Sequence, residues 1–298
     1  MDPLVVLFGL GVGLLVGLTG IGGGSLMTPL LIIVAGYSPL VAIGTDLAYG
    51  AITKTVGGWR VFRKGHVDMR LSMWLAFGSV PGALVGVWAV DRLHHAYGDA
   101  FQPALLAAVA GALLLVAFGV LFRSFFMPRH IAQEKPTADL SASSRRAATV
   151  AIGAVLGFIL GLTSVGSGAL IGLALILFFK LTPHRVVGTD VFHAAVLLWT
   201  AGIAHWIGGN VDFGLMGTIL LGSIPGVWIG TGLLGKVPVD GLRPALGVVL
   251  LAAALGVLSK AGVAMPLGAL IGIPLCVGVA AVVLHRARPR GGEEVLAT

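Results

Sequence analysis

The chain has 298 residues, of which 57% are hydrophobic and only 10% are charged, and its mean hydropathy is +1.02. So few charges cannot cover a water-soluble globule of this length, so the composition excludes that class and indicates an integral membrane protein. The 46 glycines and the lack of alternating apolar and polar residues favour a helical bundle over an outer-membrane barrel. The single cysteine, Cys276, excludes disulfides and a cysteine-based metal centre, and we expect no cofactor.

Apolar segments predict helices along both halves of the chain. In chain order they cover 4–18, 25–36, 39–59, 71–90 and 103–122, and then, after a polar stretch, 147–162, 168–179, 184–207, 213–234, 242–258 and 265–284. We therefore divide the chain into a first membrane repeat (1–122), a cytoplasmic linker (123–146), a second membrane repeat with one extra C-terminal helix (147–285) and a cytoplasmic tail (286–298).

The two halves repeat each other at a constant offset. The glycine-rich break GLTGIGGGS at 17–25 returns as GLTSVGSGA at 161–169 (161 − 17 = 144). Residues outside the break recur at the same offset, namely Pro39, Gly44, Thr45 and Asp46, which match Pro183, Gly188, Thr189 and Asp190. Because proline and aspartate are scarce in this chain, their common register predicts an internal duplication.

The basic residues predict how the repeats cross the membrane, since basic loops stay on the cytoplasmic side. They gather at the ends of apolar segments, so the net charge of +7 does not indicate a nucleic-acid partner. Clusters near residues 65, 145 and 182 and in the tail place all four stretches inside; the tail cluster is Arg286, Arg288 and Arg290. Segment 147–179 then enters and leaves by one face.

We interpret each glycine-broken segment as a re-entrant hairpin, with tips at 19–25 and 163–168, because each arm is expected to be too short to span comfortably. Each repeat then has a hairpin and three crossings, so the repeats are inverted and their tips meet near the midplane from opposite faces. The alternative counts each broken segment as one crossing, which makes the halves parallel and places the tail outside.

A glycine-rich break at membrane depth must line a polar cavity or receive a ligand, because unpaired backbone amides are not tolerated in hydrocarbon. The arm after each break starts with free amides and a positive dipole end, which favour an anion. The alternative is that the glycines only permit a tight turn. We expect positive φ angles at these glycines and hydroxyl donors beside them, so the predicted substrate-binding residues are Thr19, Gly20, Gly22, Gly23, Gly24, Ser25, Thr163, Ser164, Gly166, Ser167 and Gly168.

Intramembrane carboxylates are functional candidates. Asp46 and Asp190 therefore have two interpretations: they couple transport to protons, or they tether a neighbouring hairpin arm by hydrogen bonds. His193, on the face of Asp190, is a third proton-coupling candidate. For Lys54 we favour snorkelling to the cytoplasmic end.

Other polar and small residues have structural interpretations. Asp68 and Asp212 are expected to be helix N-caps, and we place Ser79 on a packing ridge away from the tips. Four sets of glycines spaced four apart predict close helix packing: Gly9, Gly13 and Gly17; Gly78, Gly82 and Gly86; Gly153, Gly157 and Gly161; and Gly222, Gly226 and Gly230.

These residues resemble a known family. The resemblance is carried by the run Leu18-Thr19-Gly20-Ile21-Gly22-Gly23-Gly24, by Pro39 with Gly44-Thr45, by the loop Gly65-His66-Val67-Asp68 and by the repeat of these features in the second half. With these features the chain is similar to the sulfite exporter TauE/SafE family of permeases over nearly its whole length. The resemblance implies export or uptake of sulfite, thiosulfate, sulfoacetate or related anions. The second break, Ser164-Val165-Gly166-Ser167-Gly168, departs from a full glycine run and leaves the balance between the two tips open.

Together these features predict an all-α, multi-pass protein of the inner membrane: a secondary transporter, with export favoured, for a small sulfur-containing anion such as sulfite or an organosulfonate. We expect alternating access around the paired tips, with proton coupling as an option. The expected partners are the anion and the lipid bilayer, and no oligomeric state is indicated. The alternatives are a passive anion channel and, less favoured, an intramembrane enzyme, for which no nucleophile with a base or metal cluster is found at one depth.

Overall fold

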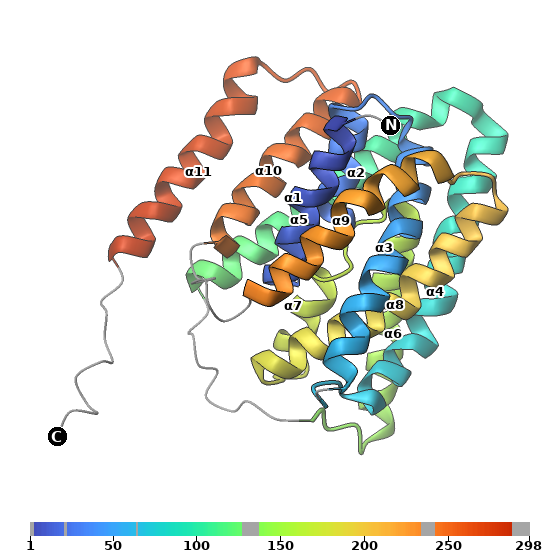
Figure 1. Ribbon diagram of the computed structural model, residues 1–298, viewed down its shortest axis with the longest axis vertical. Helices are drawn as coiled ribbons and strands as arrows, with labels where there is room; N and C mark the ends of the chain where they lie inside the picture. Colours follow the sequence, from blue (N-terminus) through green and yellow to red (C-terminus); the bar gives the residue numbers. More distant parts are fainter. Residues whose placement is uncertain (1–2, 21–22, 64, 127–136, 234–241, 288–298) are drawn as a thin grey trace.

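The protein is a bundle of helices (Figure 1). The structure, a computed structural model, describes residues 3–20, 23–63, 65–126, 137–233 and 242–287. The described helices are α1 (Pro3–Thr19), α2 (Gly23–Ile33), α3 (Pro39–Arg63), α4 (Met69–Tyr97), the short 3₁₀ helix η1 (Gly98–Phe101), α5 (Gln102–Phe126), α6 (Ser143–Thr163), α7 (Leu170–Leu177), α8 (Pro183–Ile207), α9 (Phe213–Leu233), α10 (Leu242–Lys260) and α11 (Leu267–Ala287).

The helices follow the predicted apolar segments, with two differences in the second hairpin. α6 begins at Ser143, has 21 residues and is long and apolar enough to cross a membrane, so the expectation that this arm is too short is wrong. α7 is shorter than expected, with 8 residues. By length and hydropathy, the described stretches able to cross a membrane are Met69–Phe125, Ser143–Thr163, Arg185–Ile207 and Phe213–Leu233.

Three helices begin together at what we call the basic end of the bundle. The Asp68 carboxylate, just before α4, accepts a hydrogen bond of 2.8 Å from the backbone N–H of Ala138, shortly before α6. Arg185, in the first turn of α8, donates to the carbonyl of Val67 (2.8 Å). Arg146 stacks over the Trp74 ring, 5.6 Å from its centroid. The starts of α4, α6 and α8, each carrying arginine, therefore lie side by side.

The linker side of α6 is fixed by a local polar cluster. The Asp139 carboxylate accepts hydrogen bonds from the hydroxyl and the backbone N–H of Ser141 and pairs with Arg145. The Ser141 contacts, together with Arg145, lower the pKa of Asp139 to about 2. Asp139 therefore stays ionised at physiological pH.

The other end of the bundle, here called the far end, holds the starts of α3 and α9. The backbone N–H of Asp212 donates to Thr45 Oγ1 over 3.0 Å, and Lys260, at the end of α10, donates to the carbonyl of Ile32, at the end of α2. The contact between Asp212 and Thr45 has a counterpart at the basic end, where the N–H of Asp68 donates to Thr189 Oγ1 over 2.9 Å.

α1 and α9 run parallel with their backbones in contact. Gly9 lies against Ile219 and Gly17 against Gly230, and a Cβ at either glycine would collide with the backbone of α9. α1 therefore starts at the far end, as α9 does, and α2 returns to it (Figure 1). We call α1 and α2 the first hairpin.

The second half repeats this arrangement at the basic end. α6 runs parallel to α4, with Gly153 against Leu75 and Gly161 against Ala83, and α7 leads back to the start of α8. We call α6 and α7 the second hairpin. All four predicted glycine sets lie at these two interfaces without room for a Cβ, so the packing prediction is confirmed.

α3 and α8 cross antiparallel at the centre of the bundle. Gly50 faces Leu198, and Gly57 faces Val191. α4 and α9 start with the predicted caps, because Asp68 Oδ1 accepts from the N–H of Leu71 (3.1 Å) and Asp212 Oδ1 from that of Leu215 (2.9 Å). α5 and α10 flank this centre, and α11 packs on α10 at the edge of the bundle (Figure 1).

Candidate functional site

The glycine tips of the two hairpins touch in the centre of the bundle. We call residues 19–25 the first tip and 163–169, one residue longer than predicted, the second tip. Ile21 and Gly22 lie outside the described residues, and Gly22 is one of the predicted binding residues. A Cβ at Gly24 would collide with the carbonyl and the hydroxyl of Ser164. The tips therefore meet through a glycine of one half and a serine of the other.

Each tip begins where a threonine ends the incoming helix. Thr19 donates its hydroxyl to the carbonyl of Leu15 (2.7 Å), and Thr163 donates to that of Ile159 (2.6 Å). The two hydroxyls thus donate within α1 and α6, and their donor role toward an anion stays a prediction.

The chain then turns through left-handed conformations. Gly20 has φ 72°, and its counterpart Ser164 has φ 60°. In the second tip, Gly166 (φ 127°) and Gly168 (φ 101°) also have positive φ, as predicted. Gly23 does not, because it is already the first residue of α2, and a Cβ there would meet no atom within 4 Å. The positive-φ prediction is therefore wrong for Gly23 and for Gly24, the next residue of α2.

Asp46, on α3, joins both hairpins. Its carboxylate accepts a hydrogen bond from the Ser164 hydroxyl (2.7 Å), in the second tip, and another from the Thr28 hydroxyl, in α2. Its side chain is buried, and its second oxygen, Oδ1, has no partner among the described residues. The hydrogen bonds of the tethering interpretation are therefore present at Asp46.

Asp190, on α8, contacts the second tip and a lysine. Its carboxylate lies close to the backbone N–H of Gly168, and its Oδ2 lies 3.9 Å from the Lys54 ammonium. Lys54 also donates to the carbonyl of Gly20 in the first tip (3.2 Å) and is only 2% exposed. The snorkelling prediction is therefore wrong, because Lys54 is buried between the two tips.

Two serine hydroxyls at the tips are buried without a partner. Ser25, in the first turn of α2, and Ser167, in the second tip, are at most 1% exposed, and neither hydroxyl forms a hydrogen bond with a described residue. A buried hydroxyl without a partner costs about 1 to 3 kcal/mol. Such groups therefore mark places where a ligand or water can be bound.

His193 lies one turn after Asp190 and pairs with α4. Its Nε2 is 3.1 Å from the hydroxyl of Ser79, and both side chains are buried. Ser79 does stand on the α4–α6 packing ridge, but its hydroxyl contacts a candidate site residue. The predicted place of Ser79 on a packing ridge is confirmed, and the contact with His193 is an additional finding.

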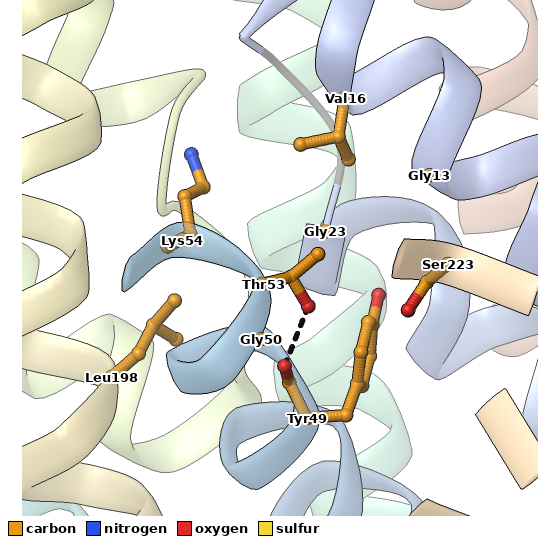
Figure 2. Close-up of a pocket in the computed structure, with 9 residues that line it drawn as sticks. All are labelled: Gly13, Val16, Gly23, Tyr49, Gly50, Thr53, Lys54, Leu198 and Ser223. Atoms are coloured by element: carbon orange, nitrogen blue, oxygen red, sulfur yellow. Dashed lines mark hydrogen bonds between the residues drawn. The ribbon is translucent and has the colours of Figure 1, made fainter. Parts of the chain in front are cut away.

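A small pocket beside the first tip contains residues that sequence reasoning missed (Figure 2). It is lined by Gly13, Val16, Gly23, Tyr49, Gly50, Thr53, Lys54, Leu198 and Ser223. Two signals in the sequence point to it: Tyr49 is three residues after Asp46 and so shares its face of α3, and Tyr49 is the first-half counterpart of His193.

Two carboxylates, a buried lysine and unpartnered hydroxyls thus surround broken helices in the middle of an otherwise apolar bundle. This arrangement is typical of many multi-pass membrane transporters, in which the solute site lies at interrupted helices near the centre of the membrane. The model of the family "Sulfite exporter TauE/SafE" matches residues 5–257. The chain belongs to this family and is a membrane transporter of the TauE/SafE type.

Curated relatives carry matching names. The chain is 41% identical to "Probable membrane transporter protein YjnA" of Bacillus subtilis (strain 168) over 231 residues, which are 78% of this chain and 89% of that protein. It is 29% identical to "Probable membrane transporter protein YdhB" of the same organism over 259 residues, 83% of this chain and 99% of that protein. No solved structure matches the chain.

Proposed function

We propose that the protein is a secondary transporter, with export as the favoured direction, that moves a small sulfur-containing anion such as sulfite or an organosulfonate across the inner membrane. The observation that supports this proposal most directly is the contact between the two glycine tips, with the unpartnered hydroxyls of Ser25 and Ser167 beside it. The family to which the chain belongs supports the sulfur chemistry.

The first tip suits an anion for electrostatic reasons. α2 starts there at Gly23, so its first N–H groups and the positive end of its dipole point into the centre of the bundle. The Ser25 hydroxyl and the Lys54 ammonium add donors beside it. The anion is held by these groups together, without a buried arginine.

The charges around the tips support proton coupling. Asp46 and Asp190 bring two negative charges, and among the described residues near the tips Lys54 alone offsets them. An anion that enters this cluster adds further negative charge in a medium of low dielectric. A proton that arrives with the anion on one of the carboxylates removes this excess, and so couples anion movement to the proton gradient.

The directions of the helices support the inverted, re-entrant topology. The first hairpin has both outer ends at the far end, and the second has both at the basic end, where arginines of three segments gather. We place the basic end in the cytoplasm, because basic loops are retained there. The tips then reach the anion from opposite sides of the membrane.

The size of the pocket favours a carrier over an open channel. The pocket beside the first tip leaves about 10 Å³ for the centre of a water molecule, which is room for roughly one water. Sulfite, with one sulfur and three oxygens, does not fit unless the walls move. Movement of the hairpins during each transport cycle is the alternating access expected of a carrier.

Flux measurements on the purified protein in liposomes test this proposal. We expect saturable movement of sulfite that depends on the imposed pH gradient, with thiosulfate, sulfoacetate and methanesulfonate as a substrate panel and phosphate as the comparison anion. Gly166→Val, which places a branched side chain at φ 127°, should abolish flux. Non-saturable flux that ignores the pH gradient would indicate a channel, and no flux of any sulfur anion would refute the substrate class.

A further inference from the structure

The two halves carry equivalent pairs of polar residues at the centre of the bundle, but only one pair is joined by a hydrogen bond. His193 and Ser79 form a hydrogen bond of 3.1 Å. At the offset of the repeat their counterparts are Tyr49 and Ser223, on α3 and α9. Neither the Tyr49 nor the Ser223 hydroxyl has a hydrogen-bond partner among the described residues, although Tyr49 is 2% exposed and Ser223 is fully buried.

The unpartnered pair faces the pocket beside the first tip (Figure 2). In this view the Tyr49 hydroxyl points toward Ser223, and Gly23, the first residue of α2, lies on the other side of the ring. Tyr49 lies close enough to the Asp46 carboxyl to interact with it electrostatically, but no hydrogen bond of acceptable geometry joins them. Thr53 is part of the wall, and its hydroxyl donates to the carbonyl of Tyr49 (2.6 Å).

The geometry fits a single oxygen atom that accepts hydrogen bonds. Two hydroxyls converge on a space with room for roughly one water, and the start of α2 adds a positive dipole end. Val16 and Leu198 make other parts of the wall apolar, and Lys54, which also lines the pocket, adds a cation that favours an anionic oxygen over a neutral one. Lys54 and Leu198 occupy equivalent positions in the two halves and both line the pocket, so its charged wall comes from the first half.

We propose that Tyr49, Ser223 and the start of α2 at Gly23 form a subsite for one oxygen of the transported oxyanion, and that the His193–Ser79 hydrogen bond closes the equivalent subsite of the other half. This inference rests on the proposed function, because it takes the substrate to be an oxygen-bearing sulfur anion. It assigns one anion to each chain, held on the side of the first hairpin.

Sulfite binding to the purified full-length protein, measured by isothermal titration calorimetry, tests the subsite. Removing one hydroxyl deletes a hydrogen bond to a charged ligand, worth about 1.5 kcal/mol or more, so Tyr49→Phe and Ser223→Ala should each weaken the affinity roughly 10-fold or more. The matched controls are Tyr97→Phe, on the exposed end of α4, and Ser72→Ala, which removes another buried and unpartnered hydroxyl outside the pocket. Both should bind sulfite as the unaltered protein does, with one anion per chain.

A second readout does not depend on how the variants fold. The chain has three tyrosines, so the unaltered protein labelled with 3-fluorotyrosine gives a small set of ¹⁹F signals. Sulfite should shift the signal of Tyr49 and leave that of Tyr97 in place. Unchanged affinity in Tyr49→Phe and Ser223→Ala, or an unshifted Tyr49 signal at saturating sulfite, would show that the pocket holds only water. If the unaltered protein binds no sulfur oxyanion, the proposed function itself fails.

Discussion

Ser164 combines an unfavourable backbone conformation with a hydrogen bond between the two halves. Its φ of 60° costs a non-glycine residue about 1 kcal/mol, and its counterpart in the first half is Gly20. The hydroxyl of Ser164 donates to Asp46, which explains why serine occupies a position that suits glycine. The departure of the second break from a full glycine run is therefore connected to Asp46.

Ser164→Ala and Ser164→Gly should separate these two effects. Alanine loses the hydrogen bond and keeps the strain, so we expect it to lower the free energy of unfolding by about 1.5 kcal/mol or more. Ser164→Gly also loses the hydrogen bond but relieves the strain. It should therefore lower the free energy of unfolding by about 1 kcal/mol less than Ser164→Ala does. Thermal unfolding in detergent measures both, with Gly20→Ala as the control for strain alone. Equal stability of the two variants would contradict the strain argument.

Lys54 and Asp190 should behave as a coupled pair. Each is buried, and removal of one partner leaves an unpaired charge, which costs about 3 kcal/mol. We therefore expect Lys54→Met and Asp190→Asn each to destabilise the protein, and the double variant to lose clearly less than the sum. A double-mutant cycle of unfolding free energies measures the coupling, and strict additivity would show that the 3.9 Å contact carries no interaction.

At this scale the sequence predicted which residues are polar and buried better than it predicted their partners. The register of Asp46 and Asp190 was visible in the repeat, but Thr28 and Ser164 reach Asp46 only through packing of separate helices. Lys54 was expected near the membrane surface because the predicted helix ended at residue 59. α3 extends to Arg63, which places Lys54 deeper in the bundle.

At the scale of elements, the glycine ridges determine how closely the hairpins pack. Gly13, on α1, faces α9, where a Cβ would lie 2.8 Å from the Cα of Ser223, whereas Gly11, two residues earlier, has no neighbouring atom within 4 Å of a Cβ. Spacing alone could predict this difference, because a glycine every fourth residue forms one face of a helix.

Gly13→Ala and Gly11→Ala therefore form a matched pair on one helix. Gly13→Ala forces α1 and α9 apart, and should lower the free energy of unfolding by about 1 to 3 kcal/mol. Gly11→Ala adds no collision and favours the helix, so it should be neutral or raise stability by up to about 1 kcal/mol. Thermal unfolding of both variants measures this difference, and a similar loss in both would mean that the α1–α9 contact is looser than described.

Helix lengths in the second hairpin were predicted less well than helix positions. The first turn of α6, Ser143–Arg146, is polar and was assigned to the linker, yet it is helical because Asp139 and Trp74 hold Arg145 and Arg146 in place. α7 is short because the second tip uses residues up to Ala169 in turns before the helix begins. Neither effect is visible in apolar periodicity.

For the whole molecule, the inverted topology makes a prediction about sidedness. In a background that lacks the exposed Cys276, we expect Ser144→Cys, at the start of α6, to be labelled only from the cytoplasm and Val263→Cys, between α10 and α11, only from outside. A cysteine in place of Arg288, which lies outside the described residues, should be labelled from the same side of the membrane as Ser144→Cys. The parallel alternative places Val263 inside and the tail outside, so membrane-impermeant thiol labelling of intact cells decides between them.

The last prediction concerns which carboxylate carries the proton during transport. The partners of Asp46 are hydroxyls, which can accept as well as donate, so a protonated Asp46 keeps its hydrogen bonds with Thr28 and Ser164. Asp190 faces the Lys54 ammonium, which cannot accept, so protonation there leaves a buried cation unpaired. The surroundings therefore tolerate a proton better on Asp46 than on Asp190.

Asp46→Asn should consequently separate anion movement from the proton gradient. The amide keeps much of the hydrogen bonding, so we expect the variant to fold, to exchange labelled sulfite across the liposome membrane and to lose the acceleration by an imposed pH gradient. Asp190→Asn should instead reduce the yield of folded protein together with flux. Flux of Asp46→Asn that still rises with the pH gradient would mean that the proton travels on another group, and loss of folded Asp46→Asn protein would assign this carboxylate a structural role.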